Sequence, residues 1–128
     1  MASLRVLAID PGSVVIGAAV IDFERGKARC LHLQSIQLRR EKSFPARLGA
    51  VFEAVTALIE QFEPQEFAIE QVFMYRSPES SLKLGQARGV AIAAAVVRGL
   101  PVYEYMPAEV KQAVVGTGRA DKVQVQHM

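Results

Sequence analysis

The hydrophobic pattern of this chain changes its period at Ser43-Phe44-Pro45, and that change limits the folds open to it more than any other feature. Three apolar runs with the character of strands precede it, over residues 4–9, 14–23 and 29–38. Polar residues around Gly26 separate the second run from the third, as in a hairpin turn. The three runs therefore predict an antiparallel meander at the start of a sheet.

Downstream of this point, helical and strand patterns alternate. Apolar residues from Leu48 to Phe62 recur at helical spacing, which predicts a helix with Pro45 in its first turn. The expected elements that follow are a strand at 67–72, a polar link at 76–79, a helix at 80–98, a strand at 102–105 and helices at 107–115 and from 120 onward. We predict one α/β domain over residues 1–128, a five-stranded mixed sheet flanked by helices on both faces.

Composition excludes several other classes of protein. A hydrophobic content of 51% over 128 residues supports a packed core, and the single cysteine, Cys30, excludes a disulfide framework. No secretory signal pattern is visible, and the most apolar stretch, residues 89–97, is too short to cross a bilayer. We therefore expect a cytoplasmic protein with no membrane partner. The net charge of +2 permits a polyanionic partner, and the basic excess lies after Glu70.

Two acidic residues belong to strongly apolar strand patterns. Asp10 closes the first run, and Glu70 interrupts the run at 67–72. Taken alone, Asp10 is equally consistent with a turn or cap residue, and Glu70 with a buried ion pair to an arginine or lysine. If the two strands are neighbours, however, the carboxylates meet at one end of the sheet. They would repel there unless they shared a proton or bound a cation.

The absence of cysteine or histidine beside these carboxylates bears on the metal they would bind. Oxygen ligands alone favour Mg²⁺ or Mn²⁺ over zinc. Carboxylate pairs of this kind support metal-assisted cleavage of a phosphodiester, in which bound ions activate water and stabilise the leaving oxygen. Asp10 and Glu70 are therefore our candidate metal ligands and catalytic residues.

Four segments together resemble the RuvC family of Holliday-junction resolvases. They are IDPGSVVIGAAVI (9–21), FAIEQVFM (67–74), SLKLGQARGVAIAAA (81–95) and VKQAVVGTGRADKVQVQHM (110–128). The match spans almost the whole chain and keeps the order of the elements. It implies a ribonuclease H-like fold, which agrees with the α/β order expected above.

The resemblance implies a homodimeric, Mg²⁺-dependent endodeoxyribonuclease. Such an enzyme binds a four-way DNA junction, nicks two strands symmetrically during recombination and repair, and works with the branch-migration motor RuvAB. Asp10 and Glu70 match two of the family's four acidic or metal-binding positions, and the other two would lie after Met128. We therefore expect a domain that lacks the last family helix. The alternative is a catalytically incomplete fragment that binds junctions and dimerises.

The resemblance also assigns roles to other residues. Lys111 and Lys122 match family lysines near the scissile phosphate and join Asp10 and Glu70 as predicted catalytic residues. The alternative for each lysine is an exposed helical position, the commonest fate of this residue type. Phe73 matches an aromatic that stacks on exposed bases, and its alternative is a core position at a strand end. The predicted DNA-binding residues are Phe73, Tyr75, Arg76, Lys83, Lys111 and Lys122.

Other interpretations stay open at this level. The small residues of the helix at 80–98 fit packing on its own sheet as well as contact with a dimer partner. The opening IDPGSVVIGAAVID also resembles the first phosphate loop of actin-like ATPases and sugar kinases, which need a second lobe that 128 residues do not supply. A related group with the same fold processes RNA, and competition between RNA and DNA junctions would distinguish it.

Overall fold

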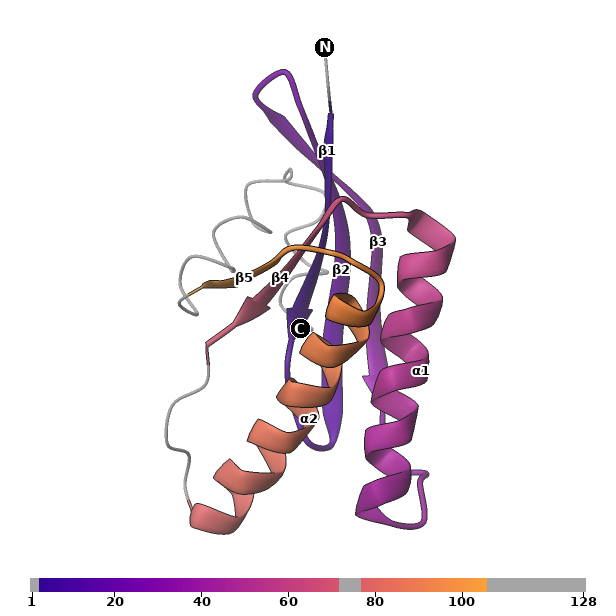
Figure 1. Ribbon diagram of the computed structural model, residues 1–128, viewed down its shortest axis with the longest axis vertical. Helices are drawn as coiled ribbons and strands as arrows, with labels where there is room; N and C mark the ends of the chain where they lie inside the picture. Colours follow the sequence, from indigo (N-terminus) through magenta and orange to yellow (C-terminus); the bar gives the residue numbers. More distant parts are fainter. Residues whose placement is uncertain (1–2, 72–76, 106–128) are drawn as a thin grey trace.

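The computed structural model describes residues 3–71 and 77–105, which form a sheet and two helices (Figure 1). The strands are β1 (Leu4–Asp10), β2 (Val15–Glu24), β3 (Lys27–Gln37), β4 (Glu66–Glu70) and β5 (Val102–Tyr105), and the helices are α1 (Phe44–Phe62) and α2 (Pro78–Val97). The expected elements within these residues are confirmed, with small shifts at their ends. The helices predicted at 107–115 and from 120 onward lie outside the described residues.

The sheet is mixed, as the sequence predicts. Its strand order is β3-β2-β1-β4-β5. β1 pairs antiparallel with β2, and β2 pairs antiparallel with β3. On its other side β1 pairs parallel with β4, and β4 pairs parallel with β5. β1 is therefore the central strand, where the antiparallel and parallel halves of the sheet meet.

Local backbone geometry explains the hairpin between β2 and β3. Arg25 and Gly26 both have positive φ, at 52° and 78°, which is the requirement of the two-residue turns that match the twist of a hairpin. Further along, the register shifts between Val20 and Ile21. A bulge of this kind changes which side chains of β3 face the core, and it accounts for the imperfect alternation of apolar residues over 29–38.

Both helices begin with a serine cap followed by proline. The Ser43 side chain accepts a hydrogen bond from the Ala46 N–H at 3.2 Å, and Ser77 accepts one from the Ser80 N–H at 3.1 Å. Proline suits the first turn, where its missing N–H would have no partner in any case. α2 therefore begins at Pro78, two residues earlier than the predicted start at Ser80, because Pro78 initiates the helix and does not belong to the preceding link.

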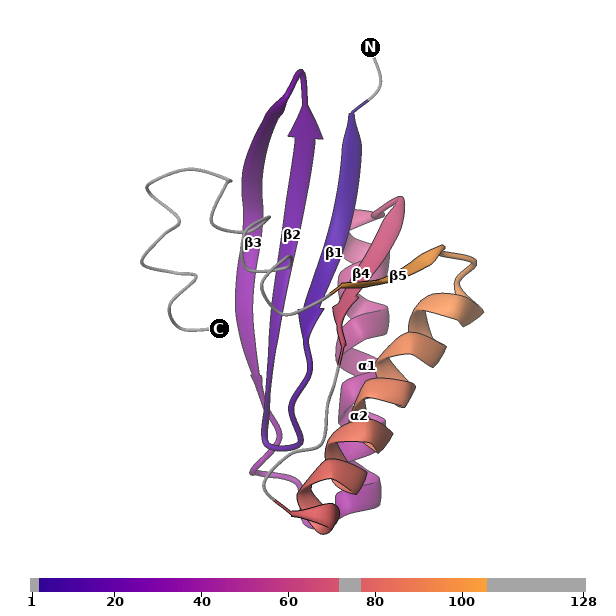
Figure 2. The same ribbon diagram turned by 90° about the vertical axis from the view of Figure 1, so that its left-hand side faces the viewer.

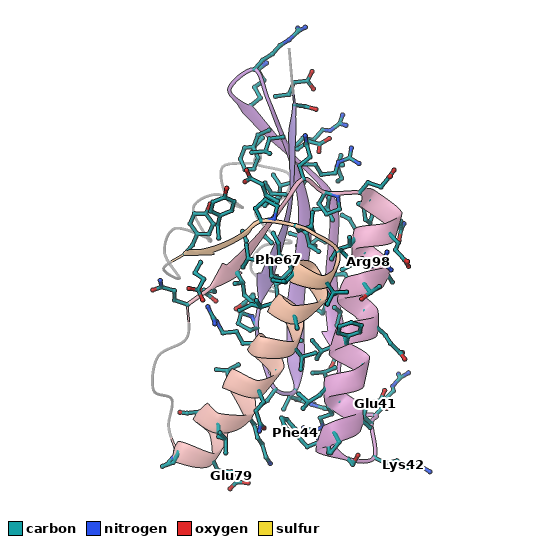
Figure 3. The ribbon with its side chains drawn as sticks, viewed as in Figure 1. Glu41, Lys42, Phe44, Phe67, Glu79 and Arg98 are labelled. Atoms are coloured by element: carbon teal, nitrogen blue, oxygen red, sulfur yellow. The ribbon has the colours of Figure 1, made fainter. Side chains whose placement is uncertain are left out.

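Both described helices cover the same face of the sheet (Figure 2). The crossovers from β3 through α1 to β4, and from β4 through α2 to β5, advance in the same direction across the sheet. Right-handed crossovers that advance in one direction place their helices on one face. The main core lies between these layers, and Phe67, labelled in Figure 3, is fully buried in the same cluster as Val55 and Ala91.

The opposite face of the sheet carries a smaller apolar cluster. It consists of Val6, Ala8, Ala19, Ile21 and Ala68. Neither α1 nor α2 covers this face (Figure 2). The expectation of helices on both faces is thus confirmed for one face only, since the remaining predicted helices fall on residues that are not described. Among the described residues, no helix is long and apolar enough to span a membrane.

Arg5 connects four parts of the fold at the end of β1 that is remote from Asp10. Its guanidinium donates to both carboxylate oxygens of Asp22 on β2, at 2.7 and 3.1 Å, and to the carbonyl of Phe62 at the end of α1, at 2.8 Å. Its N–H donates to the Gln65 side chain just before β4 at 2.8 Å. The hydrogen bond from Arg5 holds the pKa of the Asp22 carboxyl below its usual value, although partial burial opposes this effect.

We expect Asp22→Asn to lower the free energy of unfolding at pH 7 by about 1–2 kcal/mol, less than a fully buried hydrogen bond to a charged group, because the Arg5 side chain is 35% exposed and solvent screens the pair. The Asp22 pKa is lower in the folded than in the unfolded chain. Its contribution is therefore complete above the unfolded pKa of about 3.9 and is lost as the pH falls through the folded pKa. Urea unfolding from pH 7 downward should show the gap between wild type and variant closing in acid.

The exposed Glu24, also on β2, provides the control for this experiment. Glu24→Gln should change the free energy of unfolding at pH 7 little. A gap between wild type and Asp22→Asn that stayed constant into strong acid would contradict the assigned ion pair.

Candidate active site

The two candidate carboxylates lie side by side at the carboxyl ends of β1 and β4. The parallel pairing of these strands aligns Ile9 with Ile69, and Asp10 and Glu70 are the next residue of each strand. Paired strands lie about 4.8 Å apart. The expectation that the strands are neighbours, and that their acidic residues meet at one sheet end, is confirmed.

Both carboxylates lie on the face of the sheet that α1 and α2 do not cover. Ile9 and Ile69 belong to the main core beneath the helices. Side chains alternate between the two faces of a strand, so the residues that follow them point the other way. Ala8 and Ala68, which share that opposite direction, belong to the smaller cluster. Asp10 and Glu70 are each half-buried there.

The neighbouring strands place a glycine on one side of this position and a tyrosine on the other. Gly17 of β2 is aligned with Asp10 and has no side chain to cover the carboxylate. Tyr105 of β5 is aligned with Glu70 and packs against the smaller cluster. The pair of carboxylates thus lies between a glycine and a tyrosine on the same face of the sheet.

Among the described residues, an arginine binds Glu70 through its main chain and not through its carboxylate. Within residues 3–71 and 77–105, no arginine or lysine side chain forms an ion pair with its carboxylate. The nearby Arg88 instead donates from Nε to the main-chain carbonyl of Glu70 at 3.1 Å. By strand alternation, the Glu70 side chain lies on the other face of the sheet.

Two carboxylates by themselves make an incomplete metal site. No group of three or more histidine, cysteine, aspartate or glutamate side chains suited to a metal occurs in the described part of the chain. The donors present are hard carboxylate oxygens, half-buried and next to a glycine. This set fits a hard divalent cation better than zinc, and it needs further ligands.

Lys83, predicted to bind DNA, lies in the first half of α2 and has partners within the protein. Its Nζ is 3.2 Å from a Glu79 carboxylate oxygen and 5.7 Å from the centre of the Phe44 ring. Phe44 and Glu79 both lie at the end of the molecule where the two helices begin (Figure 3). A DNA contact by Lys83 stays a prediction, and it would compete with these interactions.

Other predicted site residues lie outside the described residues. These are Phe73, Tyr75, Arg76, Lys111 and Lys122. Their assigned roles stay predictions.

Two arginines near the site were not singled out by the sequence. Arg47 of α1 donates to the carbonyl of Ser13, in the turn after Asp10, at 3.4 Å. Arg88 of α2 binds the carbonyl of Glu70 itself. The one available signal for Arg88 was a charged residue between Ala87 and Gly89 in a helix otherwise rich in small residues.

Comparison with known proteins gives consistent results. The family model for crossover junction endodeoxyribonuclease RuvC matches residues 6–128. The curated RuvC of Methylococcus capsulatus is 51% identical over 124 residues, which is 97% of this chain and 74% of that protein. The RuvC of Vibrio parahaemolyticus is 57% identical over 125 residues, covering 96% of this chain and 70% of that protein.

Solved structures agree with the sequence comparison. RuvC of T. thermophilus in complex with a Holliday junction substrate superposes with a TM-score of 0.75 and 34% identity, over 87% of this chain and 69% of that one. The yeast mitochondrial resolvase Ydc2, at 16% identity and a TM-score of 0.63 over 97% of this chain and 61% of that one, shows the shared fold alone. The ribonuclease H-like fold is confirmed. The chain belongs to the crossover junction endodeoxyribonuclease RuvC family.

Proposed function

We propose that this protein is a structure-selective endodeoxyribonuclease that resolves four-way DNA junctions by paired symmetric nicks during recombination and repair. The observation that carries the proposal is the placement of Asp10 and Glu70 side by side on one face of the sheet. Family membership supports the junction as substrate, and the T. thermophilus relative was solved with a Holliday junction substrate.

We propose Mg²⁺ as the cation of this site, with Asp10 and Glu70 among its ligands. When bound, such an ion activates water and stabilises the leaving oxygen of a phosphodiester. The chain contributes two carboxylates held on one face, whose mutual repulsion a cation relieves. Two carboxylates need further ligands, and the curated relatives, of which this chain covers 74% and 70%, are longer than it is.

The contacts proposed with DNA rest on the same resemblance. Phe73 would stack on exposed bases, and Lys111 and Lys122 would act near the scissile phosphate. Tyr75 and Arg76 would reach the centre of the junction. The same proposal includes the branch-migration motor RuvAB as the partner that delivers the junction. It also includes a cytoplasmic location, where the DNA substrate lies.

We further propose that two copies of the chain associate through α2. Leu82, Val96 and Val97 are exposed at 64%, 57% and 71%. With Gly89 and Ala93, which are also exposed, they follow helical spacing along one side of α2, here called the exposed α2 stripe. A Cβ at Gly89 would meet open space, so a partner helix could approach closely. A two-fold dimer suits a substrate with two equivalent cut sites.

We expect Asp10→Asn and Glu70→Gln each to reduce junction cleavage at least about a hundredfold, because removal of one group that stabilises developing charge typically costs this much. Junction binding, measured by gel shift, should change little. The measurement is the rate of symmetric nicking of a labelled four-way junction in Mg²⁺.

Asp22→Asn is the matched control for this test, because Asp22 is a strand aspartate at the remote end of the sheet, paired with Arg5. It should cut at nearly the wild-type rate at a temperature where it is folded. Retained cleavage by Glu70→Gln would contradict the assignment. A chain that binds junctions without cutting them would support the fragment alternative, and joining it to the C-terminal segment of the M. capsulatus relative should then restore cleavage.

We expect Mg²⁺ to stabilise the wild-type protein and not Glu70→Gln. A ligand that binds only the folded state adds about 2.7 kcal/mol to the free energy of unfolding at a hundred times its Kd. Thermal unfolding with Mg²⁺ or with a chelator gives the difference for each protein. An equal response of both proteins to Mg²⁺ would mean that the cation binds elsewhere.

We expect Ala93→Glu to weaken dimerisation at least about tenfold, equivalent to about 1.4 kcal/mol, since it places an unpaired charge in an apolar contact. Sedimentation equilibrium measures the dimer dissociation constant. Ala57→Glu, at an exposed position of α1, makes the same chemical change away from the exposed α2 stripe and should leave association unchanged. Equal effects of the two substitutions would place the contact elsewhere.

A further inference from the structure

Arg88 joins α2 to the ends of two strands at the candidate active site. Its Nε donates to the Glu70 carbonyl at 3.1 Å, and its Nη2 donates to the Glu104 carboxylate on β5. The Arg88 side chain is only 17% exposed, whereas that of Glu104 is 48% exposed. One guanidinium, largely shielded from water, therefore holds α2, the last residue of β4 and a residue of β5 together.

The sequence explains why the Glu70 carbonyl needs a side-chain partner. The Phe67 N–H donates to Pro101, just before β5, and the Gln71 N–H donates to Tyr105 of β5. Alternation therefore directs the main chain of Glu70 toward β1. In a parallel ladder its carbonyl would accept from the residue after Asp10. That residue is Pro11, which has no N–H and cannot continue the ladder. Arg88 supplies the donor that Pro11 lacks.

We propose that Arg88 is a positioning residue that fixes the Glu70 carboxylate beside Asp10 by holding the Glu70 main chain from the opposite face of the sheet. The carbonyl and the side chain leave the same short stretch of backbone, so anchoring one restricts the other. A hydrogen bond from a guanidinium is stronger than one between neutral groups. The role rests on the proposed function, because a position matters only if the carboxylate acts on metal and DNA.

We expect Arg88→Met to lower the rate constant of junction cleavage at saturating Mg²⁺ by about tenfold to a hundredfold, since displacement of a catalytic group by about 1 Å can cost a hundredfold. The Mg²⁺ concentration for half-maximal rate should rise, and the Mg²⁺-induced increase in Tm without DNA should shrink. Junction affinity, measured in Ca²⁺, should not change. Arg88→Lys, which keeps one cationic donor, should recover part of the rate.

Two variants separate positioning from a general loss of stability. Arg98→Met removes an arginine at the C-terminal end of α2. Arg98 pairs with Glu60 of α1, and it lies ten residues after Arg88 in the sequence. Glu104→Gln removes the carboxylate partner but keeps the bond from Arg88 to the Glu70 carbonyl. Both variants should have nearly the wild-type cleavage rate and nearly the wild-type Mg²⁺-induced increase in Tm. The assays are run at a temperature at which the Tm measured with a chelator shows the variants to be folded.

The outcomes that overturn the inference are distinct. Equal losses of cleavage rate in Arg88→Met and Arg98→Met would show that Arg88 only stabilises the fold. The same would follow if Arg88→Met changed the Tm measured with a chelator but neither the cleavage rate nor the Mg²⁺ response. If Arg88→Met does not fold, Arg88→Lys decides, since full wild-type cleavage and Mg²⁺ response in that variant would show that the guanidinium geometry is not needed. A wild type that neither binds Mg²⁺ nor cuts junctions overturns the proposed function itself, before any variant is compared.

Discussion

The parallel pairing of β1 with β4 is the constraint on which the rest of the structure depends. It aligns Ile9 with Ile69 and so brings Asp10 and Glu70, which are far apart in the sequence, to the same end and the same face of the sheet. Antiparallel pairing with β2 on the other side makes β1 the centre of the sheet. A one-residue slip of β4 would turn its acidic residue into the core, so the buried residues of β4 also determine where the carboxylate lies.

The two faces of the sheet carry different kinds of residues. Under the helices, large apolar side chains such as Phe67 and Leu7 are fully buried and stabilise the fold. On the other face, Ala8 and Ala68 of the smaller cluster lie on the same side of their strands as the two carboxylates. Arg88 connects the two faces, because it belongs to the helical layer and donates a hydrogen bond to the main chain of Glu70. In the proposed role of Arg88, stability and site geometry are coupled through this one side chain.

Local patterns predicted most of the described elements. Short apolar runs identified the strands, three- and four-residue spacing identified α1, and the polar residues around Gly26 marked the hairpin. The start of α2 was placed two residues late because Pro78 suits both a link and a first helical turn. The shared face of α1 and α2 follows from the direction of two crossovers across the sheet, which no local pattern contains.

The sequence by itself determined the chemistry available: two carboxylates in apolar strands, a proline directly after one of them, and motifs that resemble one nuclease family. Only the tertiary structure decided which groups meet. Asp10 and Glu70 were expected to approach if their strands paired, whereas the contacts of Arg88 with the Glu70 carbonyl and of Lys83 with the Phe44 ring were not expected. The physical reason is that these contacts join separate elements and depend on long-range packing, which periodicity and propensity do not encode.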